Sequence, residues 1–299
     1  MSPHAPAAPR PDREARALEV RRVLRLVLWL NVAVLVMKVG VWGLSHSLSV
    51  VAEIFHSGLD ATNNVFALTV ARLASRGPDE DHPYGHHKFE TLGALALVGV
   101  LSVTVFELIQ QALLRLVSGQ APGVDVSGWA VALMSISAVA GIAISRYETR
   151  VARRLGSALL LADAAHTRSD VLTTLAVLAG LVATRAGYPV ADPIATILVA
   201  VIIGLTGWAI VRETVPVLVD SRAVDPGRIE ILAMAVDGVH SAYGIRSRGR
   251  PGERFAELTI AVDPGLDVQA SHDIADTVER RIAEALGARD VVVHVEPWP

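Results

Sequence analysis

The chain has 299 residues, of which 52% are hydrophobic and 19% are charged, and its mean hydropathy is +0.45. Soluble globular domains carry about 25% charged residues, so this balance indicates a membrane protein. The net charge of −3 gives no reason to expect a nucleic-acid partner, and the absence of cysteine excludes both disulfides and thiolate metal ligands.

The chain begins with a tail, residues 1–20, that we expect to be disordered. Its first 13 residues are rich in Pro, Ala and Arg, a composition that cannot bury a core. A secretory signal is not indicated, because the apolar run after the tail is too long and no small-residue cleavage site follows it. We therefore expect this run to remain as a first membrane span.

Six long apolar segments lie between residues 21 and 213 and predict a six-span, all-α transmembrane domain. Most exceed the roughly 20 residues that a helix needs to cross about 30 Å of hydrocarbon. In lipid they must be helical, since each backbone polar group has to find its partner within the segment. The segments cover about residues 23–44, 48–74, 92–117, 129–144, 155–186 and 193–211.

Positive charge is distributed unevenly among the connections between these segments. Arginine and lysine gather in the N-terminal flank and in the loops after the second and fourth segments, and they are nearly absent from the other connections. Because positive loops stay in the cytoplasm, both termini are predicted to lie there. We expect a multi-pass protein of a bacterial inner (plasma) membrane.

Residues 214–299 have the pattern of a small water-soluble domain, which the same argument places in the cytoplasm. Helical and strand patterns follow in the order helix, strand, strand, helix, strand, and a Gly-Arg-Pro-Gly turn separates the first two strands. This order predicts a ferredoxin-like α+β domain (αββαβ). Its elements are expected at about 226–236, 240–248, 254–262, 268–286 and 290–295.

One motif occurs in both the second and the fifth apolar segment. Residues 52–60 and 162–170 both read Ala, acid, two apolar residues, His, three residues, Asp. On a helix, His and Asp four residues apart lie on one face. In a soluble helix they usually form a solvated surface pair, but ionisable groups inside a membrane span are costly and are functional by default. Two such helices packed together would form a tetrahedral site for a divalent metal from His56, Asp60, His166 and Asp170.

The combination of six spans, paired His-x-x-x-Asp motifs and an α+β tail resembles the cation diffusion facilitator family. Residues 79–90, Asp-Glu-Asp-His-Pro-Tyr-Gly-His-His-Lys-Phe-Glu, and residues 293–297, Val-His-Val-Glu-Pro, strengthen the resemblance. It implies a homodimeric, proton-coupled exporter of divalent metals whose transport site is the His2Asp2 set. It also implies a metal site in the loop after the second span, at Asp79, His82 and His86, for which a merely solvated loop is the alternative.

The C-terminal domain departs from the family pattern. Positions where many members carry metal-binding histidines hold Tyr243 and Thr259 in this chain. The candidate ligands that remain are His272 on the second helix, and His294 with Glu296, which share one face of the last strand. Dimerisation is the expected role of this domain, and metal binding is an open alternative.

The resemblance also implies an ion pair where the two domains join. Lys88 lies at the entry to the third span, and Asp220 lies just beyond the sixth. In similar family members, a lysine in this Gly-His-x-Lys position pairs with an acid at the junction and interlocks the dimer. Two unrelated charges at the membrane surface are the alternative.

A metal ligand must lose its proton to bind, so a His2Asp2 site couples metal binding to proton release. Histidine titrates near neutral pH, and such a site can load metal at cytoplasmic pH and release it outside as protons enter. Rocking of the helices would expose the site to each side in turn. No covalent step is involved, so we expect a transporter rather than an enzyme, with the metal as cargo and no prosthetic group.

Imidazole ligands favour zinc, cobalt and iron over manganese and magnesium. Zinc is therefore the expected cargo, with cadmium, cobalt and ferrous iron behind it. Glu53 and Asp163 precede the two motif histidines by one helical turn. They are candidates for supporting the ligands or carrying protons, with helix packing as the alternative, and Arg168 is a candidate partner for an acidic neighbour.

Three other functions compete with metal export. A monovalent cation/proton antiporter is disfavoured by the paired histidines, since sodium and potassium prefer oxygen ligands. A membrane metalloenzyme is disfavoured because the chain has no His-Glu-x-x-His motif and four protein ligands leave no position for water. A membrane-anchored metal sensor that moves no ions is compatible with the sequence.

Overall fold

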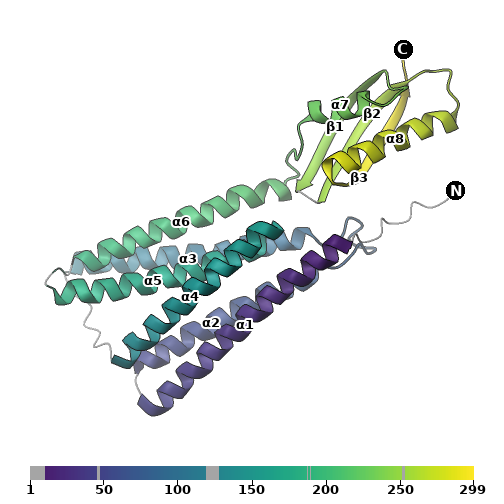
Figure 1. Cartoon of the computed structure of the whole chain (residues 1–299). Coiled ribbons are helices and arrows are strands. Elements are labelled where there is room, and N and C mark those ends of the chain that lie inside the picture. Colours follow the sequence, from purple (N-terminus) through teal and green to yellow (C-terminus); the bar gives the residue numbers. More distant parts are fainter. Residues whose placement is uncertain (1–10, 46–47, 119–127, 187, 189, 251–252) are drawn as a thin grey trace. The chain divides into compact units, whose positions relative to one another are not determined.

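In the computed structural model, the described backbone comprises residues 11–45, 48–118, 128–186, 188, 190–250 and 253–299. The chain divides into two compact units, Met1–Thr214 and Val215–Pro299. The first is helical, and the second combines helices with a small sheet (Figure 1).

Six long helices form the first unit, and each coincides with one of the predicted apolar segments (Figure 1). Among the described residues, α1, α3, α4 and α6 are each long and apolar enough to cross a membrane. That all six helices cross remains a prediction. Their bounds are α1 Pro11–Ser45, α2 Leu48–Ala74, α3 Lys88–Ser118, α4 Gly128–Leu155, α5 Ala158–Arg185 and α6 Ala191–Leu218.

The start of α1 differs from the expectation of a disordered tail through residue 20. Residues 11–20 are helical, because they consist largely of Glu, Ala, Arg and Leu, which favour helices, with a proline suited to the first turn. This first part of α1 also contacts the rest of the unit. Glu19 pairs with Arg154 of α4, and Val20 is buried in the helical core. Composition alone does not show these contacts.

The core of the helical unit takes apolar side chains from all six helices, and leucines of three of them are its largest fully buried members. α1 packs beside α2, α4 beside α5, and α3 against α5. At their centre the leucine side chains are at most 1% exposed, and in lipid such packing stabilises through close van der Waals contact rather than water exclusion. These side chains are Leu24 of α1, Leu97 and Leu101 of α3, and Leu159 and Leu160 of α5.

Large apolar side chains also cover the outside of this unit. Trp29, Phe106, Val139, Leu205 and Trp208 are each 64–70% exposed. An apolar surface of this extent is unfavourable in water and is what a lipid-facing helix requires. The helical unit therefore belongs in a membrane.

The second unit is the predicted αββαβ domain. Strands β1 (Ser241–Arg250) and β2 (Glu253–Val262) are antiparallel, and β3 (Ala288–Pro297) adds to β2 in parallel, giving the order β1–β2–β3. Helix α7 (Pro226–Met234) precedes the sheet, and α8 (Val268–Leu286) makes the crossover that two parallel strands need. The predicted bounds agree with these elements to within a few residues.

Both helices of this unit pack on one face of the sheet. Asp267 caps the start of α8 by accepting a hydrogen bond from Ala270 N, and Gly287 ends the helix with a φ of 61°, which favours glycine. The shared core contains Ile229 of α7, Val278 and Ile282 of α8, and Leu258 and Ile260 of β2.

Candidate metal centre

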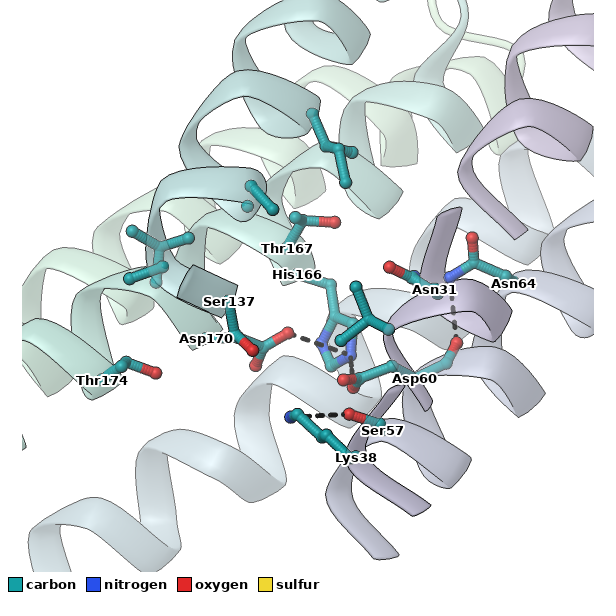
Figure 2. Close-up of a pocket in the computed structure, with 16 residues that line it drawn as sticks. Asn31, Lys38, Ser57, Asp60, Asn64, Ser137, His166, Thr167, Asp170 and Thr174 are labelled. Carbon is teal, nitrogen blue, oxygen red and sulfur yellow. Dashed lines mark hydrogen bonds and ion pairs between the residues drawn. The ribbon is translucent and has the colours of Figure 1, made fainter. Parts of the chain in front are cut away.

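Helices α2 and α5 bring Asp60, His166 and Asp170 together inside the membrane unit (Figure 2). His166 Nε2 lies 3.6 Å from Asp60 Oδ1 and 3.7 Å from Asp170 Oδ2. Three of the four predicted central residues thus converge. The fourth, His56, lies in α2 one turn before Asp60, but its side chain is outside the described residues.

The spacing of these ligand atoms suits a small divalent cation. Zinc bonds of about 2.0–2.1 Å place neighbouring ligand atoms about 3.3 Å apart in a tetrahedron. The separations of His166 Nε2 from the two carboxylate oxygens exceed this value by only a few tenths of an ångström. One imidazole nitrogen and two carboxylates can therefore close on a metal through small side-chain movements.

The three residues line a cavity of about 80 Å³ to which α1, α2, α4 and α5 contribute. His166 is 7% exposed, while Asp60 and Asp170 are partly exposed. Figure 2 shows their side chains pointing toward one another. The ligand groups are therefore shielded from bulk solvent and still open to an ion.

Two residues near the ligands were missed by the sequence reasoning. Asn63 Nδ2 lies 3.1 Å from His166 Nε2 and donates to it when that nitrogen carries no proton. Lys38 of α1 is 2% exposed, lines the same cavity, and donates to Ser57 Oγ at 2.8 Å. The spacing of seven residues between His56 and Asn63 was an available signal, as was a lysine inside an apolar span.

The other charged residues of the two motifs, Glu53, Asp163 and Arg168, do not share one environment. Arg168 was expected to pair with an acidic neighbour, and among the described residues it donates instead to the hydroxyl Oγ1 of Thr206 in α6, at 3.0 Å. Asp163 is 1% exposed and lies against Glu148 of α4, a residue that the sequence reasoning did not single out. The side chain of Glu53 lies outside the described residues.

The loop between α2 and α3 gathers Asp79, His82 and His86. Asp79 Oδ1 lies 3.1 Å from His82 Nδ1, and Asp79 Oδ2 lies 3.3 Å from His86 Nε2. His86 is 3% exposed, and its Nδ1 donates to the backbone oxygen of Gly77 at 3.1 Å. This contact orients the ring so that Nε2 faces the other two residues, as ligand-supporting contacts do in metal sites.

The pKa of the Asp79 carboxyl lies below its ordinary value of 3.8. Desolvation raises this pKa, but hydrogen bonds from the backbone and side chain of His82 and the charges of His86 and His82 lower it by more. The carboxylate therefore remains ionised and available as a ligand.

The candidate metal ligands of the second unit each lie near a single carboxylate and do not form a cluster of three. His272 Nε2 lies 3.7 Å from Asp276 in α8, and His294 Nε2 lies 3.5 Å from Glu296 in β3. Tyr243 donates its hydroxyl to Glu296, and this hydrogen bond raises the tyrosine pKa. Within the described ranges, the groups of three or more potential ligands are the central and loop clusters. A metal site in the second unit stays a prediction.

The predicted pair of Lys88 and Asp220 would join the two units. Lys88 begins α3 in the first unit. Asp220 lies just after α6 in the second unit and accepts a hydrogen bond from Arg248 Nη1 at 3.2 Å. The Lys88–Asp220 pair stays a prediction.

Comparison with known proteins identifies the domain family of each unit. The cation efflux transmembrane domain matches residues 24–219, and the cytoplasmic domain of cation efflux proteins matches residues 223–298. An uncharacterized transporter of Methanocaldococcus jannaschii is 30% identical, over 93% of this chain and 98% of that protein. The cation-efflux pump FieF of Klebsiella pneumoniae is 28% identical, over 89% of this chain and 88% of that protein.

A solved structure of the MamM CTD is 26% identical and covers 24% of this chain and 92% of that chain, with a TM-score of 0.23. The family match extends over more than half of the chain and includes the helices that carry the central cluster. The membrane unit and the small α+β domain thus both match domains of cation efflux proteins. This chain belongs to the cation diffusion facilitator family of divalent-metal efflux transporters.

Proposed function

We propose that the protein exports zinc in exchange for protons through a site formed by His56, Asp60, His166 and Asp170. The observation that carries this proposal is the convergence of three of these side chains on one cavity in the membrane unit. Cadmium, cobalt and ferrous iron are the next expected cargoes. The chain catalyses no covalent reaction, and the metal is its substrate.

Proton coupling follows from the chemistry of the ligands. Carboxylates and imidazole bind a metal only in their deprotonated forms, so protons and metal compete for the same atoms. His166 faces two carboxylates within 3.7 Å, and a proton on its ring is held by both. A divalent metal entering the cavity displaces this proton, and a proton entering from the opposite side displaces the metal.

The proposed setting is a bacterial inner membrane with both termini in the cytoplasm. This orientation rests on positive charge around the predicted cytoplasmic connections. Between α2 and α3 it comprises Arg72 in the last turn of α2, Arg76 in the loop and Lys88 at the start of α3. The cytoplasmic domain is proposed to hold a homodimer together, and the match to the cytoplasmic domain of cation efflux proteins supports this role. The Asp79, His82 and His86 cluster is proposed as a second metal site at the cytoplasmic surface.

Zinc flux in proteoliposomes tests the proposed function. The full-length protein is reconstituted into vesicles that contain a zinc-sensitive dye, with an acidic interior and neutral exterior. We expect external zinc to enter while the interior becomes more alkaline, and we expect collapse of the pH gradient to stop the entry. Zinc binding without entry would indicate a sensor, and alkalinisation driven by sodium or potassium would indicate a monovalent cation antiporter.

A further inference from the structure

A buried lysine of α1 shares the cavity of the metal centre, although it is not one of the proposed metal ligands. Lys38 is 2% exposed, and its Nζ donates a hydrogen bond to Ser57 Oγ of α2 at 2.8 Å (Figure 2). Both side chains line the cavity to which Asp60, His166 and Asp170 also belong. A positively charged side chain therefore lies in the space that a metal ion would enter.

The sequence of α1 directs this lysine toward the cavity. Asn31, Val34 and Lys38 all line it, and spacings of three and four residues place them on one face of the helix. Met37 and Val39, on either side of the lysine, are exposed apolar side chains, as a lipid-facing surface requires. A charge inside a membrane span is costly and is functional by default, so the position of Lys38 indicates a role in the cavity.

The charges around the cavity are balanced differently with and without a metal ion. Among the described residues that line it, the charged side chains are Lys38, Asp60 and Asp170, and His166 is the remaining titratable group. Counting His166 as neutral, two carboxylates and one ammonium group give a net charge of about −1, and Zn²⁺ changes this to about +1. Without the ammonium group, the two carboxylates would match the charge of zinc. The lysine therefore opposes zinc binding.

The same ammonium group has the opposite effect on the empty centre. Carboxylates that are partly removed from water repel one another, and removing the positive partner of such a group is destabilising. Protein and lipid screen these interactions less than water does. Lys38 thus stabilises the metal-free state of Asp60 and Asp170 and destabilises the zinc-bound state.

We propose that Lys38 is a built-in cation of the metal centre, which stabilises the carboxylates while the centre is empty and promotes the release of zinc. This inference rests on the proposed export through that centre. An ammonium group has no lone pair with which to bind a metal, so Lys38 is a positioning residue that acts through Asp60 and Asp170. Because export requires release as well as binding, a fixed positive charge limits how tightly the cargo is held.

A purely structural role would be to join α1 to α2 through the hydrogen bond to Ser57. The two roles differ in what they do to the metal-free and zinc-bound states. Loss of a structural contact weakens both states to a similar degree. Loss of the built-in cation weakens the metal-free state and strengthens the binding of zinc.

The test compares Lys38→Gln, which removes the charge but keeps a donor for Ser57, with Lys38→Met, which removes both. Zinc affinity is measured by equilibrium dialysis of the full-length protein in detergent, and the melting temperature is measured with and without zinc. We expect both variants to bind zinc about tenfold or more tightly than the parent. Both should melt at a lower temperature without zinc and gain more from zinc than the parent does.

Three further variants separate charge from packing. Lys38→Arg keeps the charge and should stay close to the parent in zinc affinity. Ser57→Ala removes the hydrogen-bond acceptor but keeps the ammonium group, so it should not tighten zinc binding. Arg212→Gln removes an exposed cation of α6 outside the cavity and is the matched control. So that zinc at other sites does not mask the centre, the parent and all variants carry alanine at His82, His86, His272 and His294.

Unchanged or weaker zinc binding in both Lys38→Gln and Lys38→Met would overturn the proposal. An equal fall in melting temperature with and without zinc would also overturn it, in favour of a structural contact. In proteoliposomes, Lys38→Gln should lower both the half-saturating zinc concentration and the maximal flux, since zinc that is held more tightly leaves more slowly. A raised half-saturating concentration would contradict this expectation.

A measurement that retains Lys38 covers the case in which these variants do not fold. Lys38 and Lys88 are the lysines of the chain, so Lys88→Arg leaves a single lysine for selective ¹³C labelling at Cε. The NMR signal of Lys38 should shift when zinc is added, and an unchanged signal at saturating zinc would contradict the proposal. Failure of the parent protein to bind zinc at all would instead contradict the proposed function.

Discussion

At the scale of single residues, His166 is the centre of the candidate site. Its Nε2 faces Asp60, Asp170 and the amide of Asn63, at 3.6, 3.7 and 3.1 Å. The imidazole nitrogen is a borderline ligand, whereas the carboxylate oxygens are hard ligands. The balance between these two ligand types should set which metals the site prefers.

Replacing both His56 and His166 by Asp should weaken zinc binding and relatively favour manganese, because hard oxygen replaces borderline nitrogen. Competition between the two metals, measured by equilibrium dialysis of the purified protein, gives the preference directly. His240→Asp, at an exposed position in the second unit, serves as the control. An unchanged zinc-to-manganese ratio would mean that cavity geometry, rather than ligand type, sets the selectivity.

The loop cluster should respond to acid through Asp79. Its folded-state pKa lies below the ordinary 3.8, so its carboxylate stabilises the loop above that pH and loses this effect as the pH falls through the lowered pKa. The His82 amide donates to Asp79 Oδ1 at 2.7 Å. Hydrogen exchange should show this amide protected at neutral pH and unprotected in strong acid.

Asp79→Asn should weaken that protection already at neutral pH. The amide of Gly85, which donates to the backbone oxygen of His82, provides an internal reference. Equal protection of the His82 amide in the wild type and in Asp79→Asn would show that another contact holds the loop.

At the scale of helices, one buried glutamate accepts hydrogen bonds from segments that are far apart in the chain. Glu90 of α3 is 5% exposed; it accepts from Ser157 Oγ at 2.6 Å and from Arg16 Nη2 at 3.2 Å. Arg16 Nε also donates to the backbone oxygen of Leu155 at 2.7 Å. These contacts join α1 and α3 to the α4–α5 turn.

Glu90→Ala should destabilise the helical unit, because it leaves Ser157 and Arg16 without this acceptor. Removing one partner of a fully buried pair costs about 3–5 kcal/mol, and we expect about 1–3 kcal/mol here because the Arg16 side chain is 27% exposed. Thermal unfolding in detergent measures the loss. As a comparison, Glu19→Ala removes the ion-pair partner of Arg154. Because this pair is more exposed than that of Glu90 and Arg16, the change should lower the melting temperature less. Equal shifts would contradict this ranking.

The helices and strands were largely predictable because their signals are local. Apolar length located α1–α6, and strand alternation with a Gly-Arg-Pro-Gly turn located β1 and β2. The i, i+4 spacing placed His166 and Asp170 on one face of α5, and the recurrence of the motif in α2 predicted that Asp60 would lie opposite them. Lys38 could have been noticed as a lysine inside an apolar span. Glu148 and the Glu90 contacts were missed because they depend on which helices pack together, and periodicity within one segment does not determine that.

At the scale of the whole molecule, the junction between the units is proposed to support the dimer through Lys88 and Asp220. Asp220 has a positive φ of 51° and is partnered by Arg248 within its own unit. A role in the dimer therefore has to be distinguished from a local role in the second unit. Arg248 and the proposed partner Lys88 can be removed separately.

Lys88→Ala and Asp220→Ala should each weaken dimerisation, and the charge-swapped double variant should recover part of the loss. Arg248→Ala is the matched control, because it removes the local partner and keeps the Asp220 carboxylate. Analytical ultracentrifugation in detergent measures the dimer affinity. If Arg248→Ala weakens the dimer as much as Lys88→Ala does, Asp220 acts within the second unit rather than through Lys88.

Transport should depend on the central carboxylates individually. Asp60→Ala or Asp170→Ala should abolish zinc flux and leave the protein folded and dimeric, because each carboxylate serves as both metal ligand and proton carrier. Flux in proteoliposomes and size-exclusion chromatography check the two parts of this expectation. Asp237→Ala, at an exposed position in the second unit, should transport normally. Normal flux in either central variant would contradict the assignment of the transport site.

The most direct test of the central site is zinc K-edge X-ray absorption of a full-length variant from which the competing histidines have been removed. The account predicts bound zinc with nitrogen and oxygen neighbours at about 2.0 Å and imidazole scattering, and predicts loss of this zinc when Asp60→Ala and Asp170→Ala are added. Zinc that is absent from the first variant, or that keeps the same surroundings after both carboxylates are removed, would contradict a metal centre between α2 and α5. The histidines to be replaced by alanine are His82, His86, His272 and His294.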